Sequence, residues 1–148
     1  VLTRDIVSPV KASVEGLDDI ISQIEREQMK EVIYPLLPKD WVSEIEYYTV
    51  NEFSSKVIDN NEILVVTSDE INSDFNEDKY CAIDGEIIRC CDHLSAFTEA
   101  YLSLSYGVGC EQIVSGYRQL AERYNNKTAG GIDFSNIFGG FEENTWKN

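Results

Sequence analysis

The stretch CCDHLSAFTEA, residues 90–100, decides how the rest of the chain is interpreted. It places an acid, Asp92, beside His93, the one histidine of the chain, in a segment with the apolar content of a core helix. The surrounding pattern predicts a helix over residues 84–105, ended by the glycines at positions 107 and 109. An acid in such a helix raises the question of a chemical role.

A helical wheel places Asp92 at one edge of the expected apolar face, about 140° from Ile87 at 100° per residue. The small side chains of Ser95 and Ala96 follow one turn later and leave room for a ligand. His93 points to the opposite side and is interpreted as a surface residue. Asp92 is therefore open to two interpretations. It is either an acid at the solvent boundary that acts as a cap or pairs with a basic side chain, or a metal ligand or catalytic acid that faces a cleft. The side chains expected to face the core are Ile87, Cys91, Leu94, Thr98, Tyr101, Leu102 and Ser105.

The rest of the pattern predicts an all-α fold in one domain, residues 1–148, with a minor extended part. The first helix begins at Pro9 or just after Gly16, because glycine weakens a helix interior. Between the second and third helices, residues 63–66 could form a short strand, but the polar acidic residues after them indicate a surface loop or short helix for this segment. The aromatic tail is expected to pack onto the helices. The predicted ranges are helices at 9–36, 40–58, 84–105 and 111–124, and the tail at 132–141.

Composition narrows the classes of partner. The chain has 27 acidic and 12 basic residues, a formal net charge of -15, which repels nucleic acid polymers and anionic membranes. A small phosphorylated molecule remains compatible if a divalent cation lies between it and the carboxylates. No apolar run reaches the roughly 20 residues of a spanning helix. The four cysteines form no Cys-x-x-Cys pair, which predicts reduced thiols in a cytoplasmic protein.

A second polar segment, LTRDIVSPVK at residues 2–11, precedes the first helix. Its local interpretation is a capping loop in which Asp5 or Ser8 accepts helix N–H bonds and Pro9 takes the first turn.

Together, LTRDIVSPVK and DGEIIRCCDHLSAFTEAYLSLSYGV (residues 84–108) resemble two segments of the HD-superfamily phosphohydrolases, most closely the branch similar to 5'-deoxynucleotidases. That resemblance implies a helical bundle of the HD-domain type. In this family a first His, a contiguous His-Asp pair and a distant Asp bind a divalent metal such as Mn, Co or Mg. It also implies hydrolysis of a nucleotide or a similar phosphomonoester.

Carried over by position, Asp92 matches the distant metal-binding Asp of the family. Asp5 matches an acid that helps to activate or orient the attacking water, and Lys11 matches a phosphate-side or structural residue. These residue types suit the chemistry, because a metal neutralises phosphoryl oxygens while a carboxylate positions the nucleophile.

The first His and the His-Asp pair would precede Val1, so the resemblance implies a bundle incomplete at its N-terminus. We therefore expect this chain to be the C-terminal part of an HD-type domain, inactive alone, with apolar surface exposed where the other helices would pack. The alternatives are a non-catalytic helical module that forms a homodimer or another interface, and a nucleotide-binding regulator that has lost the chemistry.

Overall fold

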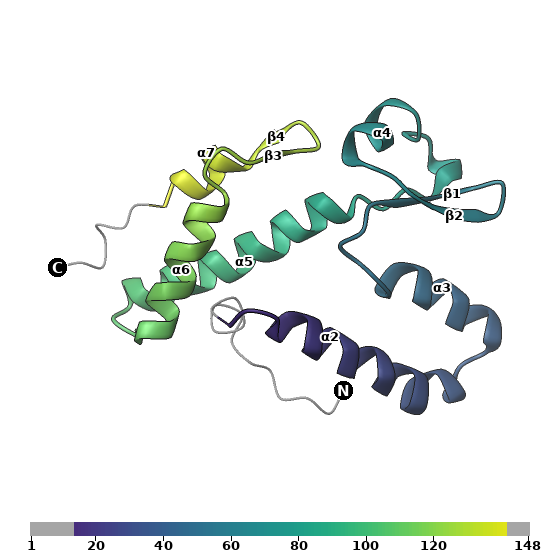
Figure 1. The fold of residues 1–148 in the computed structure, drawn as a ribbon, viewed down its shortest axis with the longest axis horizontal. Coiled ribbons are helices and arrows are strands. Elements are labelled where there is room, and N and C mark those ends of the chain that lie inside the picture. The colour runs from purple at the N-terminus through teal and green to yellow at the C-terminus, as the bar shows by residue number, and fades with distance from the viewer. Residues whose placement is uncertain (1–13, 142–148) are drawn as a thin grey trace.

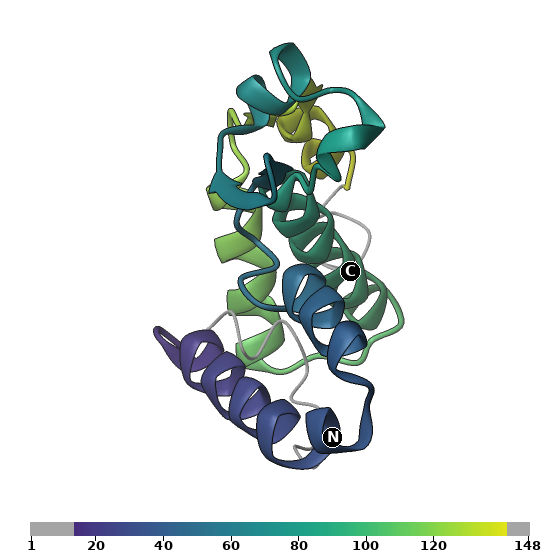
Figure 2. The same ribbon diagram turned by 90° about the vertical axis from the view of Figure 1, so that its right-hand side faces the viewer.

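A computed structural model describes residues 14–141, which form a mostly helical chain with two short hairpins (Figure 1). The all-α prediction is confirmed. The longest helix, α5 (Gly85–Ser105), runs through the middle of the molecule. The helices α2 and α3 lie on one side of α5, and α4 and α7 lie on the other (Figure 2).

The first described helix starts just after Gly16, the second of the two predicted positions. Gly16 has a φ of 76° and so lies in the left-handed region that precedes α2 (Leu17–Gln28). The helix continues through a π-helical turn, η1 (Met29–Ile33), and a 3-10 turn, η2 (Tyr34–Leu36). After Pro38 the chain turns back as α3 (Lys39–Thr49).

The prediction of a helix up to residue 58 is wrong beyond Thr49. Backbone dihedrals turn extended at Val50, and the chain then forms β1 (Lys56–Asp59), paired antiparallel with β2 (Glu62–Val65). The two asparagines between the strands, at positions 60 and 61, have φ values of 50° and 64°. A two-residue turn with both φ positive suits a hairpin, and asparagine tolerates it better than most residues. The short strand that residues 63–66 could form is present, one residue earlier, at Glu62–Val65.

The acidic segment after β2 forms short helical turns, as one of its two interpretations required. A capping box between Thr67 and Glu70 starts α4 (Ser68–Ser73), and η3 (Asp78–Tyr80) follows. Both lie near the N-terminal end of α5 (Figure 1).

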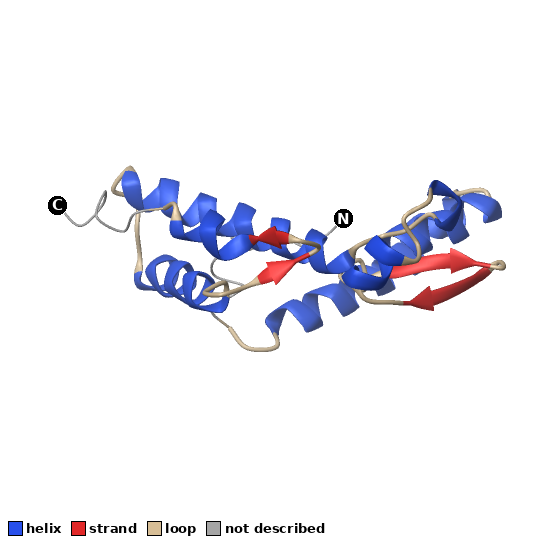
Figure 3. Cartoon of the chain, turned by 90° about the horizontal axis from the view of Figure 1, so that it is seen from above, coloured by secondary structure: helices blue, strands red, loops and turns tan. Residues whose placement is uncertain are grey.

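The core lies where α5 meets the C-terminal elements. These are α6 (Glu111–Arg123), the hairpin of β3 (Thr128–Ala129) and β4 (Ile132–Asp133), and α7 (Phe134–Gly139). Figure 3 shows the two hairpins as separate pairs of strands. The prediction that the aromatic tail packs onto the helices is confirmed. The buried cluster consists of Cys90, Ala96, Phe97, Ala100, Leu104, Tyr117, Leu120, Tyr124, Ala129, Phe134 and Phe138.

The core face of α5 differs from the prediction. Phe97 is fully buried at its centre, whereas Cys91, Leu102 and Ser105 are exposed. On the helical wheel, the observed core-facing direction of α5 lies about 90° from the predicted one. The reason is that α5 buries small residues against its neighbours, including two alanines and Cys90, and small side chains carry little weight in a hydrophobic pattern. Of the predicted face, Leu94 and Tyr101 do pack against the core.

Within residues 14–141, no helix combines the length and the apolar composition that crossing a membrane requires.

Candidate functional site

Asp92 is exposed on α5 and lies next to the segment that follows α3. Its carboxylate acts on Glu52, whose pKa is raised first by partial burial and then by the negative charges of Asp92 and Glu25. The positive charge of Lys56 lowers the pKa of Glu52. The negative charges of Glu25 on α2 and Asp92 on α5 thus both act on Glu52 in the segment after α3.

The other site residues predicted from the sequence, Asp5 and Lys11, lie outside the described residues 14–141. Their roles stay predictions.

The interpretation of His93 as a surface residue needs correction. His93 is half-buried, and its Nδ1 lies 2.8 Å from the hydroxyl oxygen of Tyr124, with the two rings edge to face. On the helical wheel it lies about 40° from Phe97, so it belongs to the side of α5 that packs against α6. Its role in the described structure is a contact between helices.

The described residues do not fit a complete metal site. Between residues 14 and 141, no group of three or more His, Cys, Asp or Glu side chains gathers closely enough to hold an ion. Asp92 offers one carboxylate, and one carboxylate binds divalent ions weakly and without selectivity. Any complete site would need ligands from outside the described residues.

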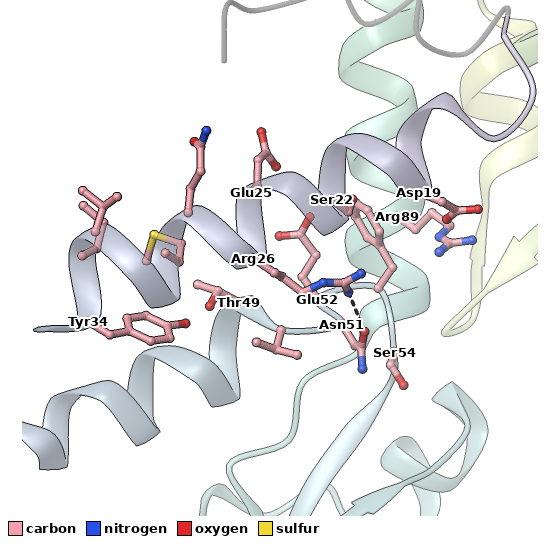
Figure 4. A pocket seen from close by; sticks show the side chains of 16 residues that line it. Asp19, Ser22, Glu25, Arg26, Tyr34, Thr49, Asn51, Glu52, Ser54 and Arg89 are labelled. Atoms are coloured by element: carbon pink, nitrogen blue, oxygen red, sulfur yellow. Dashed lines mark hydrogen bonds between the residues drawn. The ribbon is translucent and has the colours of Figure 1, made fainter. Parts of the chain in front are cut away.

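A cleft of about 650 Å³ lies between α2 with its η1 and η2 extension and the segment after α3 (Figure 4). Arg89, one turn before Asp92 on α5, also lines it. The cleft has a charged and polar part and an apolar part. Its lining consists of Asp19, Ser22, Glu25, Arg26, Gln28, Met29, Val32, Ile33, Tyr34, Thr49, Val50, Asn51, Glu52, Phe53, Ser54 and Arg89.

Two arginines are held in place at this cleft. Arg26 Nη1 donates to Asn51 Oδ1 at 3.2 Å, drawn as the dashed line in Figure 4. The guanidinium carbon of Arg89 lies 5.0 Å from the centre of the Phe53 ring, within the range of a cation–π contact.

The segment that carries Asn51 and Glu52 is held in place by the side chain of Lys56. Lys56 is buried, and its Nζ donates to the carbonyl oxygen of Val50 at 2.8 Å and lies 5.1 Å from the centre of the Tyr47 ring. Burial lowers the pKa of Lys56, while the negative charge of Glu52 raises it. This wall of the cleft therefore has a defined position.

Sequence reasoning missed the cleft because it assigned residues 50–58 to a helix. In that interpretation Asn51 and Glu52 would lie on a helical face and could not form the wall of a cleft. The available signal was the polar triplet Asp59-Asn60-Asn61, which is a hairpin turn and not a helix end.

Residues 1–121 match a protein-family model described as an HD domain. The chain belongs to the HD domain family. HD domains are generally metal-dependent phosphohydrolases, and the matched region of this HD domain contains Asp5, Lys11 and Asp92. It also contains every residue that lines the cleft. No curated protein and no solved structure matched the chain.

Proposed function

We propose that this protein is a metal-dependent phosphohydrolase that acts on a nucleotide or a similar phosphomonoester, in the branch similar to 5'-deoxynucleotidases. The observation that carries the proposal is that the HD domain match includes Asp92, the acid that the sequence resemblance pairs with the family's distant metal ligand. Its exposure and its position one turn from Arg89 support the assignment, because a ligand must be open to an incoming ion and substrate.

In this proposal Asp92 supplies one carboxylate to a divalent ion such as Mn, Co or Mg, and the other ligands come from outside residues 14–141. Asp5 orients the attacking water, and Lys11 contacts the phosphate side of the substrate. The proposed substrate is a small phosphorylated molecule and not a nucleic acid polymer, because the net charge of -15 repels a polyanion.

The test is release of phosphate from nucleoside monophosphates by the full-length gene product, with Mn, Co and Mg compared. We expect Asp92→Ala to lower turnover by more than about 100-fold, since even partners of metal ligands contribute 10- to 100-fold. Glu99→Ala is the matched control, because Glu99 is an exposed acid two turns further along α5. Circular dichroism should show the same helix content in both variants. Full turnover in Asp92→Ala would show that the ligand assignment is wrong.

A second candidate, a non-catalytic interaction module, is favoured by the apolar side chains exposed on η2 and α3. Leu36 is 78% exposed, Trp41 56% and Tyr48 53%. Exposed patches of this kind often mark protein interfaces. Replacing Leu36 and Trp41 with serine would abolish association without changing turnover if the surface serves binding alone.

A further inference from the structure

The outer edge of β2 is an open strand edge with free backbone groups. The backbone of Lys56 exchanges two hydrogen bonds with Ile83, so its N–H and C=O point away from β2. Lys56 pairs with Val65, and in an antiparallel ladder both members of such a pair point outward, as does Ile63 two residues away. Within residues 14–141 no strand pairs with this edge of β2, and Figure 3 shows the hairpin at the margin of the molecule. The N–H and C=O groups of Ile63 and Val65 therefore remain available to another strand.

The side chains of this edge do not block further pairing. Ile63 is 59% exposed and Val65 76%. The stretch from Glu62 to Thr67 contains no proline and no lysine, the residues with which natural sheets commonly protect an edge. Glu62 is the one charged residue of β2, and it lies beside the turn. An exposed apolar edge of this kind is a docking site for an additional strand.

The strand is complementary to a second copy of itself. When two copies of β2 run antiparallel with Leu64 opposite Leu64, Ile63 of each copy lies opposite Val65 of the other. This register pairs every outward N–H and C=O group of both strands. A register shifted by two residues places one of these residues opposite Asn61, which belongs to the turn, or opposite Thr67, whose N–H already donates within the cap of α4.

Charge favours the same register. It leaves the two copies of Glu62 four residues apart along the sheet, about 13 Å at the usual rise of a strand, which exceeds the Debye length of about 8 Å at physiological salt. Pairing centred on Ile63 would halve this separation. The net charge of -15 on each copy still opposes association, so added salt should strengthen it.

We propose that the outer edge of β2 joins two copies of this chain through a four-stranded antiparallel sheet, with Leu64 at the two-fold axis. The proposal is independent of the proposed function, because no residue of β2 lines the cleft. Sheets of three or more strands are more stable than a lone hairpin, which favours the addition. The contact is short compared with a standard interface, so we expect a weak dimer with a Kd of about 100 µM.

The test is sedimentation equilibrium of the 148-residue chain at a series of concentrations and salt levels. Val65→Pro removes an outward N–H and keeps the ladder with β1, because proline is tolerated where the N–H faces solvent. We expect it to raise the Kd by at least about tenfold, since the symmetric pair loses two hydrogen bonds. Val65→Thr keeps the N–H and the branched side chain, and as the matched control it should change the Kd by less than about threefold.

Cross-linking tests the register, in a background where the exposed cysteines Cys81, Cys91 and Cys110 are replaced by serine. Leu64→Cys places two thiols directly opposite each other, so mild oxidation should give a disulfide-linked dimer. Ile63→Cys is the control, because its two copies would be diagonal neighbours beyond the reach of a disulfide. Equal cross-linking of both variants would overturn the register.

A chain that stays monomeric at about 1 mM would overturn the proposal and leave the edge to a strand of another protein. Dimerisation that is unaffected by Val65→Pro and lost in the double variant Leu36→Ser, Trp41→Ser would also overturn it, because the surface of η2 and α3 would then join the copies. If Val65→Pro lowers the melting temperature, Ile63→Lys decides the outcome, since a lysine at this exposed position blocks edge pairing without entering the core.

Discussion

At the scale of single residues, Gly85 fixes the distance between α5 and the wall of the cleft. A Cβ at this position would lie 2.4 Å from the carbonyl carbon of Phe53 and 2.5 Å from backbone atoms of Ser54. Backbone atoms cannot move aside as a flexible side chain can, so the segment could not stay where it is. Glycine at position 85 therefore allows α5 to start directly against the segment that carries Asn51 and Glu52.

We expect Gly85→Ala to destabilise the protein by about 1–3 kcal/mol, the usual cost of overpacking. Thermal unfolding measures it. Gly139→Ala is the control, because a Cβ there meets no described atom within 4 Å, and alanine favours the helix. Equal melting temperatures for both variants would show that the close approach at Gly85 is relieved at little cost.

The ion pair between Glu86 and Lys127 predicts a pH dependence of stability. Lys127 lowers the pKa of Glu86 below its ordinary value, and Ser68 contributes through a second hydrogen bond. The stabilisation is therefore present above the ordinary pKa of a glutamate and is lost as the pH falls through the lowered pKa. The difference in unfolding free energy between the wild type and Lys127→Met should shrink from pH 7 to pH 3. A constant difference would indicate lost packing and not lost charge.

The electrostatic contact between Asp92 and Glu52 can be tested without any activity. Asp92→Asn removes one of the negative charges that raise the pKa of Glu52, so this pKa should fall. Carbon NMR of the Glu52 carboxyl group measures it, with Glu99→Gln as the control on the same helix. An unchanged titration would place Asp92 away from the cleft.

At the scale of elements, α7 shows how a short segment completes the core. Its Phe138 is 3% exposed and stacks on Tyr124 with ring centres 4.1 Å apart, and it also contacts Phe97 at 4.8 Å. The adjacent Ile137 is 38% exposed. The helix is held through a single buried face.

Phe138→Ala should cost about 3–5 kcal/mol of stability, the usual range for a buried phenylalanine, and chemical denaturation measures it. Ile137→Ala is the adjacent control and should cost much less. Equal losses would mean that α7 is held by its backbone contacts and not by its buried ring.

The helices at 84–105 and 111–124 were predictable because their boundaries coincide with strong local signals. Asp84 caps α5 by accepting from the N–H of Ile87, and glycines follow Ser105. Only one strand of the β1–β2 hairpin was predictable. The strand β1 is stabilised by pairing with β2, and local propensity does not account for such a pairing. The orientation of α5 was not predictable for a related reason: it depends on which helix packs against Ala96 and Ala100.

At the scale of the whole molecule, apolar side chains remain exposed on the side of α2 and α3. Ile20 is 58% exposed and Leu36 78%. The place of Asp92 on a helix was predictable from the sequence pattern, and its role as a metal ligand stays a prediction, whereas the cleft required the three-dimensional path of residues 49–54. The exposed side chains agree with the sequence-based expectation that this chain has apolar surface available for further packing.

The 148-residue chain should therefore bind a hydrophobic dye such as ANS. The double variant Leu36→Ser, Trp41→Ser should bind less, because it removes two large apolar side chains that are more than half exposed. Val65→Ser on β2 is the control, since Val65 is 76% exposed but belongs to the β1–β2 hairpin and not to η2 or α3. A chain that binds no dye would show that this surface is covered in solution.

The contact between His93 and Tyr124 gives the protein an internal spectroscopic reporter. Because the sequence has one histidine, the imidazole Cε1–H signal is a single line in the proton NMR spectrum and needs no isotope label or assignment experiment. His93 comes from α5 and Tyr124 follows α6, so the line responds to the spacing of the two helices. A temperature step or a substitution that loosens this interface would shift the signal before the helices themselves unfold.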